Sequence, residues 1–280
     1  SSVRCRIAVV QMISCMDVEA NLVAVSRLAV KAAGNNIQAI FLPENFAALA
    51  NTNPRLIGIG EETSSGPVRN CLSELARETG CWIFAGTMPV SVRPDGSPVS
   101  APRVRAASLV YDDEGCEVGR YDKMHMFDVD VADSHRHYLE SDGFEAGTDI
   151  LCIDSVIGKI GLSVCYDIRL PELYRKLSSL GARSFAIPSA FTEVTGRAHF
   201  EVLMRSRAIE NFCFTIAACQ GGEHDSGRKT FGHSMVVGPW GEILARATTG
   251  EDILIAELDF DRQNEIRRNM LVHLQRKLPV

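Results

Sequence analysis

The chain has 280 residues and a mass of 30.6 kDa, with 46% hydrophobic residues, 23% charged residues and a mean hydropathy of +0.02. This composition is ordinary for a globular protein and excludes the disordered, collagen-like and coiled-coil classes. Acidic residues outnumber basic ones by 35 to 29, so we expect no nucleic-acid partner.

Short apolar runs alternate with longer amphipathic ones, which predicts a mixed α/β fold of alternating strands and helices. In the first half, the pattern predicts strands over 6–11, 37–42 and 81–86, helices from Asp17 to Gly34 and over 67–80, and a hairpin of 106–111 with 117–121. In the second half, it predicts strands over 159–164, 183–187 and 213–219, helices over 171–181 and 199–211, and a closing antiparallel set of 232–237, 242–246 and 252–258.

The loosest segments, 93–102 and 125–147, are expected to be surface loops. No linker rich in Pro, Gly or Ser divides the chain. We therefore predict a single domain over residues 1–280, with a core at about 4–260.

The cysteine content indicates a reducing compartment. The nine cysteines are odd in number and form no C-x-x-C pair, and a chain of this size does not need disulfide staples. The N-terminus lacks the regions of a signal peptide, although a leader removed from a longer precursor would leave the same sequence. No apolar run reaches the roughly 18 residues of a membrane span. We expect a cytoplasmic protein with no membrane partner.

Three potentially reactive residues follow apolar strands, the position at which open α/β sheets place their sites. Glu44, in an apolar setting, would act as a general base. Lys123 would stabilise a developing oxyanion. Cys165 precedes a helix that starts at Pro171, where backbone N–H groups favour a thiolate. Taken singly, each also fits a structural role: a solvated carboxylate, a surface lysine and a core cysteine.

Taken together, these residues resemble the Glu-Lys-Cys triad of the carbon–nitrogen hydrolase (nitrilase) superfamily, and the resemblance runs from about residue 4 to 275. The matching blocks are LPENF at Glu44, YDKMHMFDVD at Lys123 and GLSVCYDIRLPELYR at Cys165, with LES at Glu140 and further family-like stretches over 188–211 and 231–242. The resemblance implies a four-layer α-β-β-α sandwich and hydrolysis without cofactor or metal. It also implies a homodimer or higher homo-oligomer, with the tail 261–280 at an interface.

Within the superfamily, the runs AACQGGEH and GRKTFGHSMVV resemble the Nit branch, and in it the deaminated glutathione amidases more than the ω-amidases. Phe200, Leu170 and Gly238 depart from the usual Trp, Phe and Asp of that pattern, but none of them touches the triad. The resemblance implies an amidase that cleaves a small carboxylated amide through a thioester and releases ammonia. The alternatives are an ω-amidase acting on α-ketoglutaramate-like compounds, an N-carbamoyl amino acid hydrolase, or a non-catalytic member of the fold.

The expected mechanism assigns one role to each residue. Glu44 takes the proton of Cys165, while Lys123 and the backbone N–H of Tyr166 hold the oxyanion. Glu140 keeps Lys123 charged and oriented, or positions the substrate.

The substrate carboxylate needs a cation, and three arginines in nearby loops are candidates: Arg169, Arg197 and Arg228. Phe191 and Thr192 follow a predicted strand end and are expected to line the pocket.

A zinc hydrolase is one alternative chemistry. It would use a cluster in the long loop, made of His125, His135, His137, Asp128, Asp130 and Asp133. The cluster lacks an HExxH or CxxC pattern. A Cys–His hydrolase is another alternative, with His199 or His233 as the base for Cys165.

Overall fold

Two six-stranded sheets form the centre of the computed structural model, which describes residues 4–280. The first sheet contains β1 (Arg4–Gln11), β2 (Ala39–Leu42), β3 (Trp82–Val90), β4 (Arg105–Tyr111), β5 (Glu117–Asp122) and β16 (Asp252–Asp259). The second contains β8 (Cys152–Ile153), β9 (Ile160–Leu162), β10 (Ser184–Ala186), β11 (Phe214–Ala217), β14 (Met235–Val237) and β15 (Ile243–Arg246).

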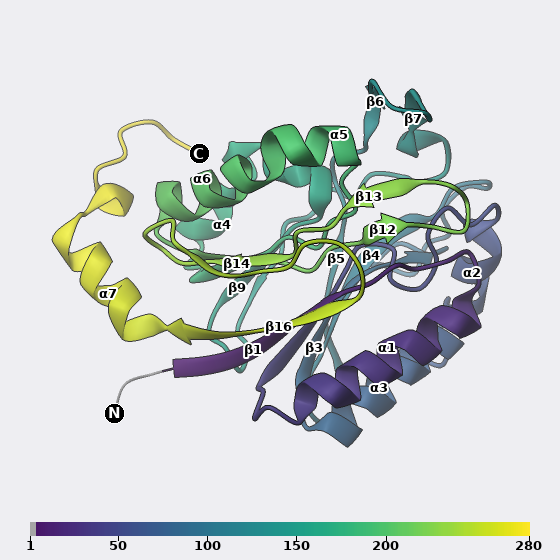
Figure 1. Cartoon of the computed structure of the whole chain (residues 1–280), viewed down its shortest axis with the longest axis horizontal. Coiled ribbons are helices and arrows are strands. Elements are labelled where there is room, and N and C mark those ends of the chain that lie inside the picture. Colours follow the sequence, from purple (N-terminus) through teal and green to yellow (C-terminus); the bar gives the residue numbers. More distant parts are fainter. Residues whose placement is uncertain (1–3) are drawn as a thin grey trace.

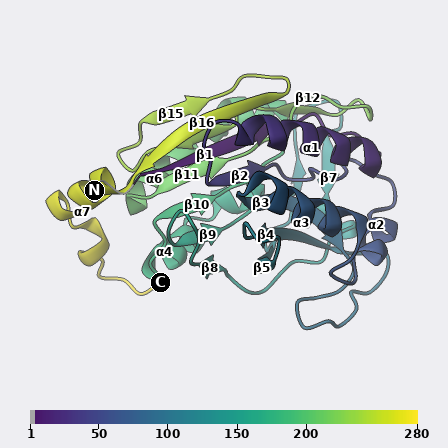
Figure 2. The same ribbon diagram turned by 90° about the horizontal axis from the view of Figure 1, so that it is seen from below.

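Helices cover the outer face of each sheet (Figure 1). The first sheet is covered by α1 (Val18–Ala33) and α3 (Pro67–Thr79), and the second by α4 (Pro171–Ser179) and α6 (Glu201–Asn211). Figure 2 shows the same layers after a quarter turn. The four-layer α-β-β-α sandwich is therefore confirmed.

The two sheets share one pattern of strand pairing. Their orders are β16-β1-β2-β3-β4-β5 and β8-β9-β10-β11-β14-β15. In each, the first pair is antiparallel, the next two are parallel and the last two are antiparallel. The parallel strands in the middle of each sheet therefore direct their carboxyl ends to one edge of that sheet.

β1 shows how the sequence builds the layers. Ile7 and Val9 contribute to the core between the two sheets, while Ala8 and Val10 face the helical layer. All four are fully buried, so the strand is apolar throughout, as expected for a strand covered on both faces. Next along the chain, the Asp17 side chain caps α1 by accepting a hydrogen bond from the Ala20 N–H.

Three predicted boundaries and pairings are wrong. The segment 252–258 does not join 232–246 in one antiparallel set, because β16 crosses to the first sheet and pairs with β1 along eight residues. The helix predicted over 199–211 begins earlier, with α5 (Glu193–Thr195) and a π-turn over Gly196–Phe200 before α6. The loop 125–147 contains a small hairpin of β6 (Asp128–Asp130) and β7 (His137–Leu139), followed by a 3₁₀ turn, Glu140–Asp142.

Five further strands and helices have no counterpart in the sequence-based prediction. They are the edge strand β8, the helices α2 (Pro54–Gly60) and α7 (Phe260–Asn269), and the two strands of a hairpin, β12 (Gly221–Glu223) and β13 (Lys229–Phe231). The hairpin rises beside β6 and β7, at the end of the sandwich where the candidate site lies (Figure 1).

Candidate active site

Glu44, Lys123 and Cys165 line one cavity of about 220 Å³. Glu44 follows β2, Lys123 directly follows β5, and Cys165 begins a 3₁₀ helix, Cys165–Arg169, after β9. The structure thus brings together three side chains from separate strand ends. The Lys123 Nζ lies 2.9 Å from the Glu44 Oε2, and both side chains are almost completely buried.

A second carboxylate completes the surroundings of Lys123. Glu140 Oε1 lies 2.8 Å from the Lys123 Nζ and also accepts a hydrogen bond of 2.9 Å from the Phe127 N–H. The lysine ammonium is therefore held between two glutamates, Glu44 and Glu140. Glu140 reaches this position because it stands in the 3₁₀ turn that follows the β6–β7 hairpin.

Close backbone packing places Glu44. Gly86 in β3 lies where an added Cβ would collide with the Pro43 carbonyl, so only glycine allows this approach. Asn45 has a positive φ of 56°, and its N–H donates to the Thr87 Oγ1 at 2.9 Å. The Glu44 carbonyl also accepts a hydrogen bond from the Gln220 side chain at 3.1 Å. These contacts turn the carboxylate inward at the end of β2.

Cys165 has a left-handed backbone conformation, with φ of 47°. This conformation is costly for a residue other than glycine and is maintained by surrounding contacts. The Cys165 N–H donates to the Pro188 carbonyl at 2.9 Å, and the Ala190 N–H donates toward the sulfur. The sharp turn from β9 into the 3₁₀ helix presents the thiol to the cavity.

The charges of the site act on one another. Burial raises the pKa of the Cys165 thiol well above its usual value, and the negative charge of Glu44 raises it further against the opposing charge of Lys123. Burial lowers the pKa of Lys123, but Glu140 and Glu44 outweigh it and hold that pKa well above its usual value. Burial raises the pKa of Glu140. The resting state is therefore a neutral thiol beside a lysine ammonium.

A buried aspartate links the lysine loop to the cysteine loop. Asp167 is fully buried and accepts hydrogen bonds from the Tyr121 hydroxyl at 2.6 Å and from the Val164 N–H at 2.8 Å. Its other oxygen lies 2.7 Å from the His125 Nδ1. Sequence reasoning did not single out Asp167, although its position two residues after Cys165 on a helix-opening turn was a usable signal.

The predicted substrate-binding residues separate into two groups. Tyr166, Arg169, Phe191 and Arg228 line the cavity. Thr192 does not; its hydroxyl accepts a hydrogen bond from the Thr195 N–H and caps α5.

Arg197 also lies outside the cavity. It is largely exposed and pairs with Glu193 one helical turn away, at 3.2 Å. His135, which the sequence suggested only as a zinc ligand, also lines the cavity. The pattern of residues along the chain did not identify the other lining residues, which are Asn45, Phe127, Tyr138, Leu139, Ala190 and Thr195.

Comparison with known proteins identifies the family. The carbon-nitrogen hydrolase family matches residues 6–268 of this chain. The chain belongs to the carbon-nitrogen hydrolase family. It is accordingly a hydrolase that acts on carbon–nitrogen bonds other than peptide bonds, as the sequence predicted.

Several relatives of this hydrolase are named deaminated glutathione amidase. The chain is 37% identical to a deaminated glutathione amidase of Yersinia enterocolitica over 95% of this chain and 91% of the relative. It is 38% identical to one of Synechocystis, over 94% of each chain. Among solved structures, it resembles Nit3 of Saccharomyces cerevisiae, a member of branch 10 of the nitrilase superfamily, with a TM-score of 0.84 and 28% identity over 99% and 98% of the two chains.

A fusion protein gives a further match. The crystal structure of the Caenorhabditis elegans NitFhit protein has a TM-score of 0.87 and 34% identity to this hydrolase. The match covers 99% of this chain and 66% of the fusion protein.

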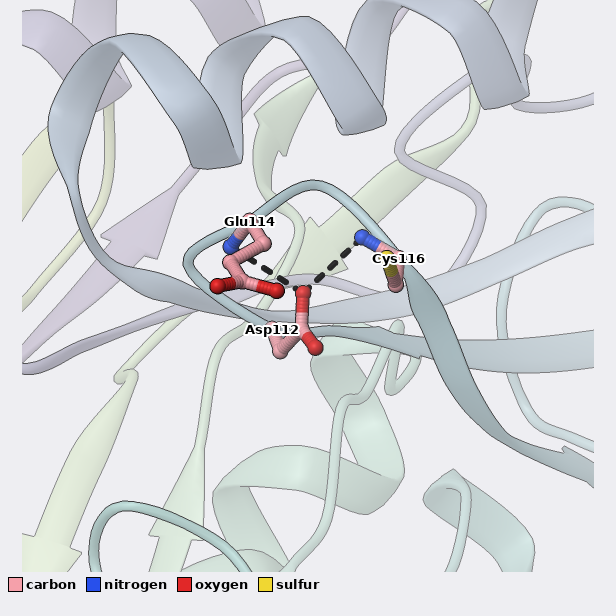
Figure 3. Close-up of side chains that lie close together, drawn as sticks. All are labelled: Asp112, Glu114 and Cys116. Atoms are coloured by element: carbon pink, nitrogen blue, oxygen red, sulfur yellow. Dashed lines mark hydrogen bonds between the residues drawn. The ribbon is translucent and has the colours of Figure 1, made fainter.

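The contacts of the histidines do not support the zinc alternative. His125 binds Asp167, and His137 binds Asp130 at 2.6 Å on the surface. Within residues 4–280, one group of side chains is close enough to share a metal ion, and it consists of Asp112, Glu114 and Cys116 in the β4–β5 turn (Figure 3). There the Asp112 Oδ1 accepts hydrogen bonds from the backbone N–H groups of the other two residues, at 3.1 and 2.9 Å, and so shapes the turn.

Neither histidine of the Cys–His alternative reaches the cavity. His199 approaches Arg169, with its Nδ1 3.2 Å from that guanidinium. His233 stacks on Phe231, and its Nδ1 bonds the carbonyl of that residue at 2.9 Å. Neither histidine lines the cavity that contains Cys165.

The sequence predicts no membrane-spanning segment, and the helices of the structure test this. Across the described residues 4–280, no helix combines the length and apolar character needed to cross a bilayer.

Proposed function

We propose that this hydrolase is an amidase that uses Cys165 as nucleophile and cleaves a small carboxylated amide through a thioester. The observation that carries the proposal is the Lys123 ammonium held between the Glu44 and Glu140 carboxylates, in the cavity that also contains Cys165. This arrangement supplies a base, a cation and a thiol in one sheltered place. The chemistry needs no cofactor.

In the acylation half, Glu44 acts first as base and then as acid. It takes the thiol proton as the Cys165 sulfur forms a bond to the amide carbon, because a thiol of raised pKa is a poor nucleophile on its own. Lys123 and the Tyr166 N–H stabilise the tetrahedral oxyanion. Glu44 then gives its proton to the amide nitrogen, the C–N bond breaks, and the amine leaves a thioester on Cys165.

In the deacylation half, water replaces the amine. Glu44 removes a proton from water as the oxygen attacks the thioester carbonyl, and the C–S bond breaks. The acid leaves, and Glu44 returns the proton to the Cys165 sulfur. Glu140 takes no proton in this scheme, because its two oxygens are engaged by Lys123 and the Phe127 N–H.

For the substrate, we propose deaminated glutathione. The relatives with that name at 34–38% identity support this choice. The chemistry of the leaving group refines the expectation of ammonia: a primary amide such as α-ketoglutaramate releases ammonia, whereas deaminated glutathione releases cysteinylglycine. A substrate panel that measures both amines distinguishes the two, and preference for the shorter amide or for an N-carbamoyl amino acid would favour an alternative.

Mass spectrometry of the intact protein during turnover tests the mechanism. We expect a mass increase equal to the acyl group, located on the Cys165 peptide, and complete loss of turnover in Cys165→Ala with unchanged circular dichroism. Cys213→Ala, a buried cysteine outside the cavity, is the matched control and should retain activity. Turnover by Cys165→Ala would refute the mechanism. Failure of all the amides to acylate the wild-type protein would favour a non-catalytic member of the fold.

A further inference from the structure

The cavity contains more positive charge than the proposed chemistry uses. Besides Lys123, two arginines line it: Arg169 and Arg228. Neither guanidinium forms an ion pair with a carboxylate of residues 4–280, whereas Arg197 just outside the cavity does. Cations without a protein counter-ion in a partly enclosed cavity attract an anionic ligand.

Arg228 lies where the cavity meets a second hollow. This adjoining hollow, of about 390 Å³, shares His135, Tyr138 and Arg228 with the first cavity and continues to Ala50 and Ser226. A ligand anchored at Cys165 and too long for the first cavity would therefore pass Arg228. The arginine comes from the turn between β12 and β13, so it approaches the site from a different element than the triad residues.

The Arg228 side chain is held in place but retains free donors. Its Nη2 donates to the Ala190 carbonyl at 3.2 Å, and its guanidinium lies 5.7 Å from the centre of the Tyr138 ring. Its buried Nε has no hydrogen-bond partner among residues 4–280. The two contacts fix the position of the guanidinium, and its remaining N–H groups are unused. Arg228 could therefore bind a carboxylate without a large rearrangement.

Arg169 has a different position. It belongs to the 3₁₀ helix that starts at Cys165, and its guanidinium lies 5.7 Å from the Tyr166 ring centre and 5.4 Å from that of Phe191. It is thus one turn from the nucleophile and does not line the second hollow. The two cations are placed to serve two different ends of an extended substrate.

We infer that Arg228 binds a carboxylate on the leaving-group side of the scissile amide, so that the enzyme selects extended amides with a terminal carboxylate over short primary amides. This inference rests on the proposed amidase function and adds a specificity-determining residue to it. In deaminated glutathione, the group in question is the glycine carboxylate. Arg169 would then bind the carboxylate of the acyl part.

A matched pair of substrates tests this assignment. One is deaminated glutathione and the other is the same compound with its glycine carboxylate converted to a carboxamide. The acyl group and scissile bond are identical, so the ratio of their kcat/KM values reports only recognition of the terminal carboxylate. We expect the wild-type enzyme to prefer the free acid by about 10- to 100-fold, the value of a charge-assisted hydrogen bond.

In Arg228→Gln, this preference should fall to about one, and Arg228→Lys should restore part of it because it keeps the charge but not the fork of donors. Arg197→Gln is the control, since Arg197 lies outside the cavity, and should keep the wild-type ratio. Equal loss with both substrates in Arg228→Gln would make Arg228 a structural residue and overturn the inference. A wild-type enzyme that hydrolyses both compounds equally well would also overturn it. Hydrolysis of neither compound would instead refute deaminated glutathione as the substrate in the proposed function.

Discussion

Lys123 is the residue on which the charge balance of the cavity depends. Its side chain is 1% exposed, and its ammonium lies between two carboxylates that would otherwise face each other. Removing one partner of a buried ionic group leaves uncompensated charge, which costs far more than the net stabilisation by the intact group. The same residue therefore serves stability and the proposed oxyanion chemistry.

Lys123→Met should lower the free energy of unfolding by about 3–5 kcal/mol at pH 7, as urea denaturation would measure. The loss should shrink as the pH falls, because Glu140, whose pKa burial already raises, becomes protonated and stops repelling Glu44. Lys159→Met is the control. The ion pair between Lys159 and Asp154 is solvent-exposed and 3.7 Å long, so the free energy of unfolding should change by less than about 1 kcal/mol. Equal effects of the two substitutions would contradict this account.

The pH at which Cys165 becomes reactive also follows from its neighbours. Burial and the charge of Glu44 raise the pKa of the thiol, so alkylation by iodoacetamide should keep accelerating above pH 9 instead of levelling off. Glu44→Gln removes the negative charge, and its alkylation profile should therefore shift to lower pH even as turnover is lost. Peptide mass spectrometry of Cys165 measures both profiles. A shift to higher pH in the variant would show that Glu44 does not act on this thiol.

At the scale of elements, the Asp167 carboxylate fastens the segment after β5 to the turn after β9. His125 contributes through its bond to Asp167, which raises the histidine pKa above its ordinary value of 6.5 while partial burial opposes the rise. A raised pKa in the folded state means that the charged bond stabilises fully below the unfolded pKa of about 6.5. This stabilisation is lost as the pH rises through the folded pKa.

His125→Gln should therefore destabilise the protein by about 1–3 kcal/mol at pH 6, and by less at pH 9. Urea denaturation at the two pH values measures the difference. His137→Gln is the control, since His137 pairs with Asp130 on the surface, where both side chains are mostly exposed. A pH-independent effect of His125→Gln would mean that the histidine acts by packing alone.

The elements that sequence predicted best are those defined by local chemistry. The helix α1 has its Asp17 cap, α3 ends at Gly80 with φ of 65°, and the Glu44, Lys123 and Cys165 blocks each follow an apolar strand. The pairing of β16 with β1 joins the two ends of the chain, and no local sequence pattern indicates it. Likewise, the sequence predicts both Arg169 and Arg197 in loops near the site, and only the three-dimensional arrangement separates the one in the cavity from the one outside it.

For the whole molecule, the face formed by α4, α6 and the C-terminal tail presents apolar side chains to solvent. Val202 on α6 is 66% exposed and Leu278 in the tail is 83% exposed. The tail residues Arg276–Val280 lie beside α4 residues and Glu210 of α6. An isologous contact with a second copy would remove these apolar side chains from water. We therefore expect the homo-oligomer that the family resemblance implies, with the tail at its interface.

Light scattering after size-exclusion chromatography tests this arrangement. The wild-type chain should have at least twice its monomer mass of 30.6 kDa at micromolar concentration. Val202→Asp and Leu278→Asp should each shift the population toward the monomer, because a charge at a buried apolar contact is costly. Val23→Asp is the matched control, since Val23 is 64% exposed on α1 in the opposite helical layer. A wild-type monomer would refute the homo-oligomer, whereas equal dissociation by Val23→Asp would place the interface elsewhere and leave the tail without a specific role in assembly.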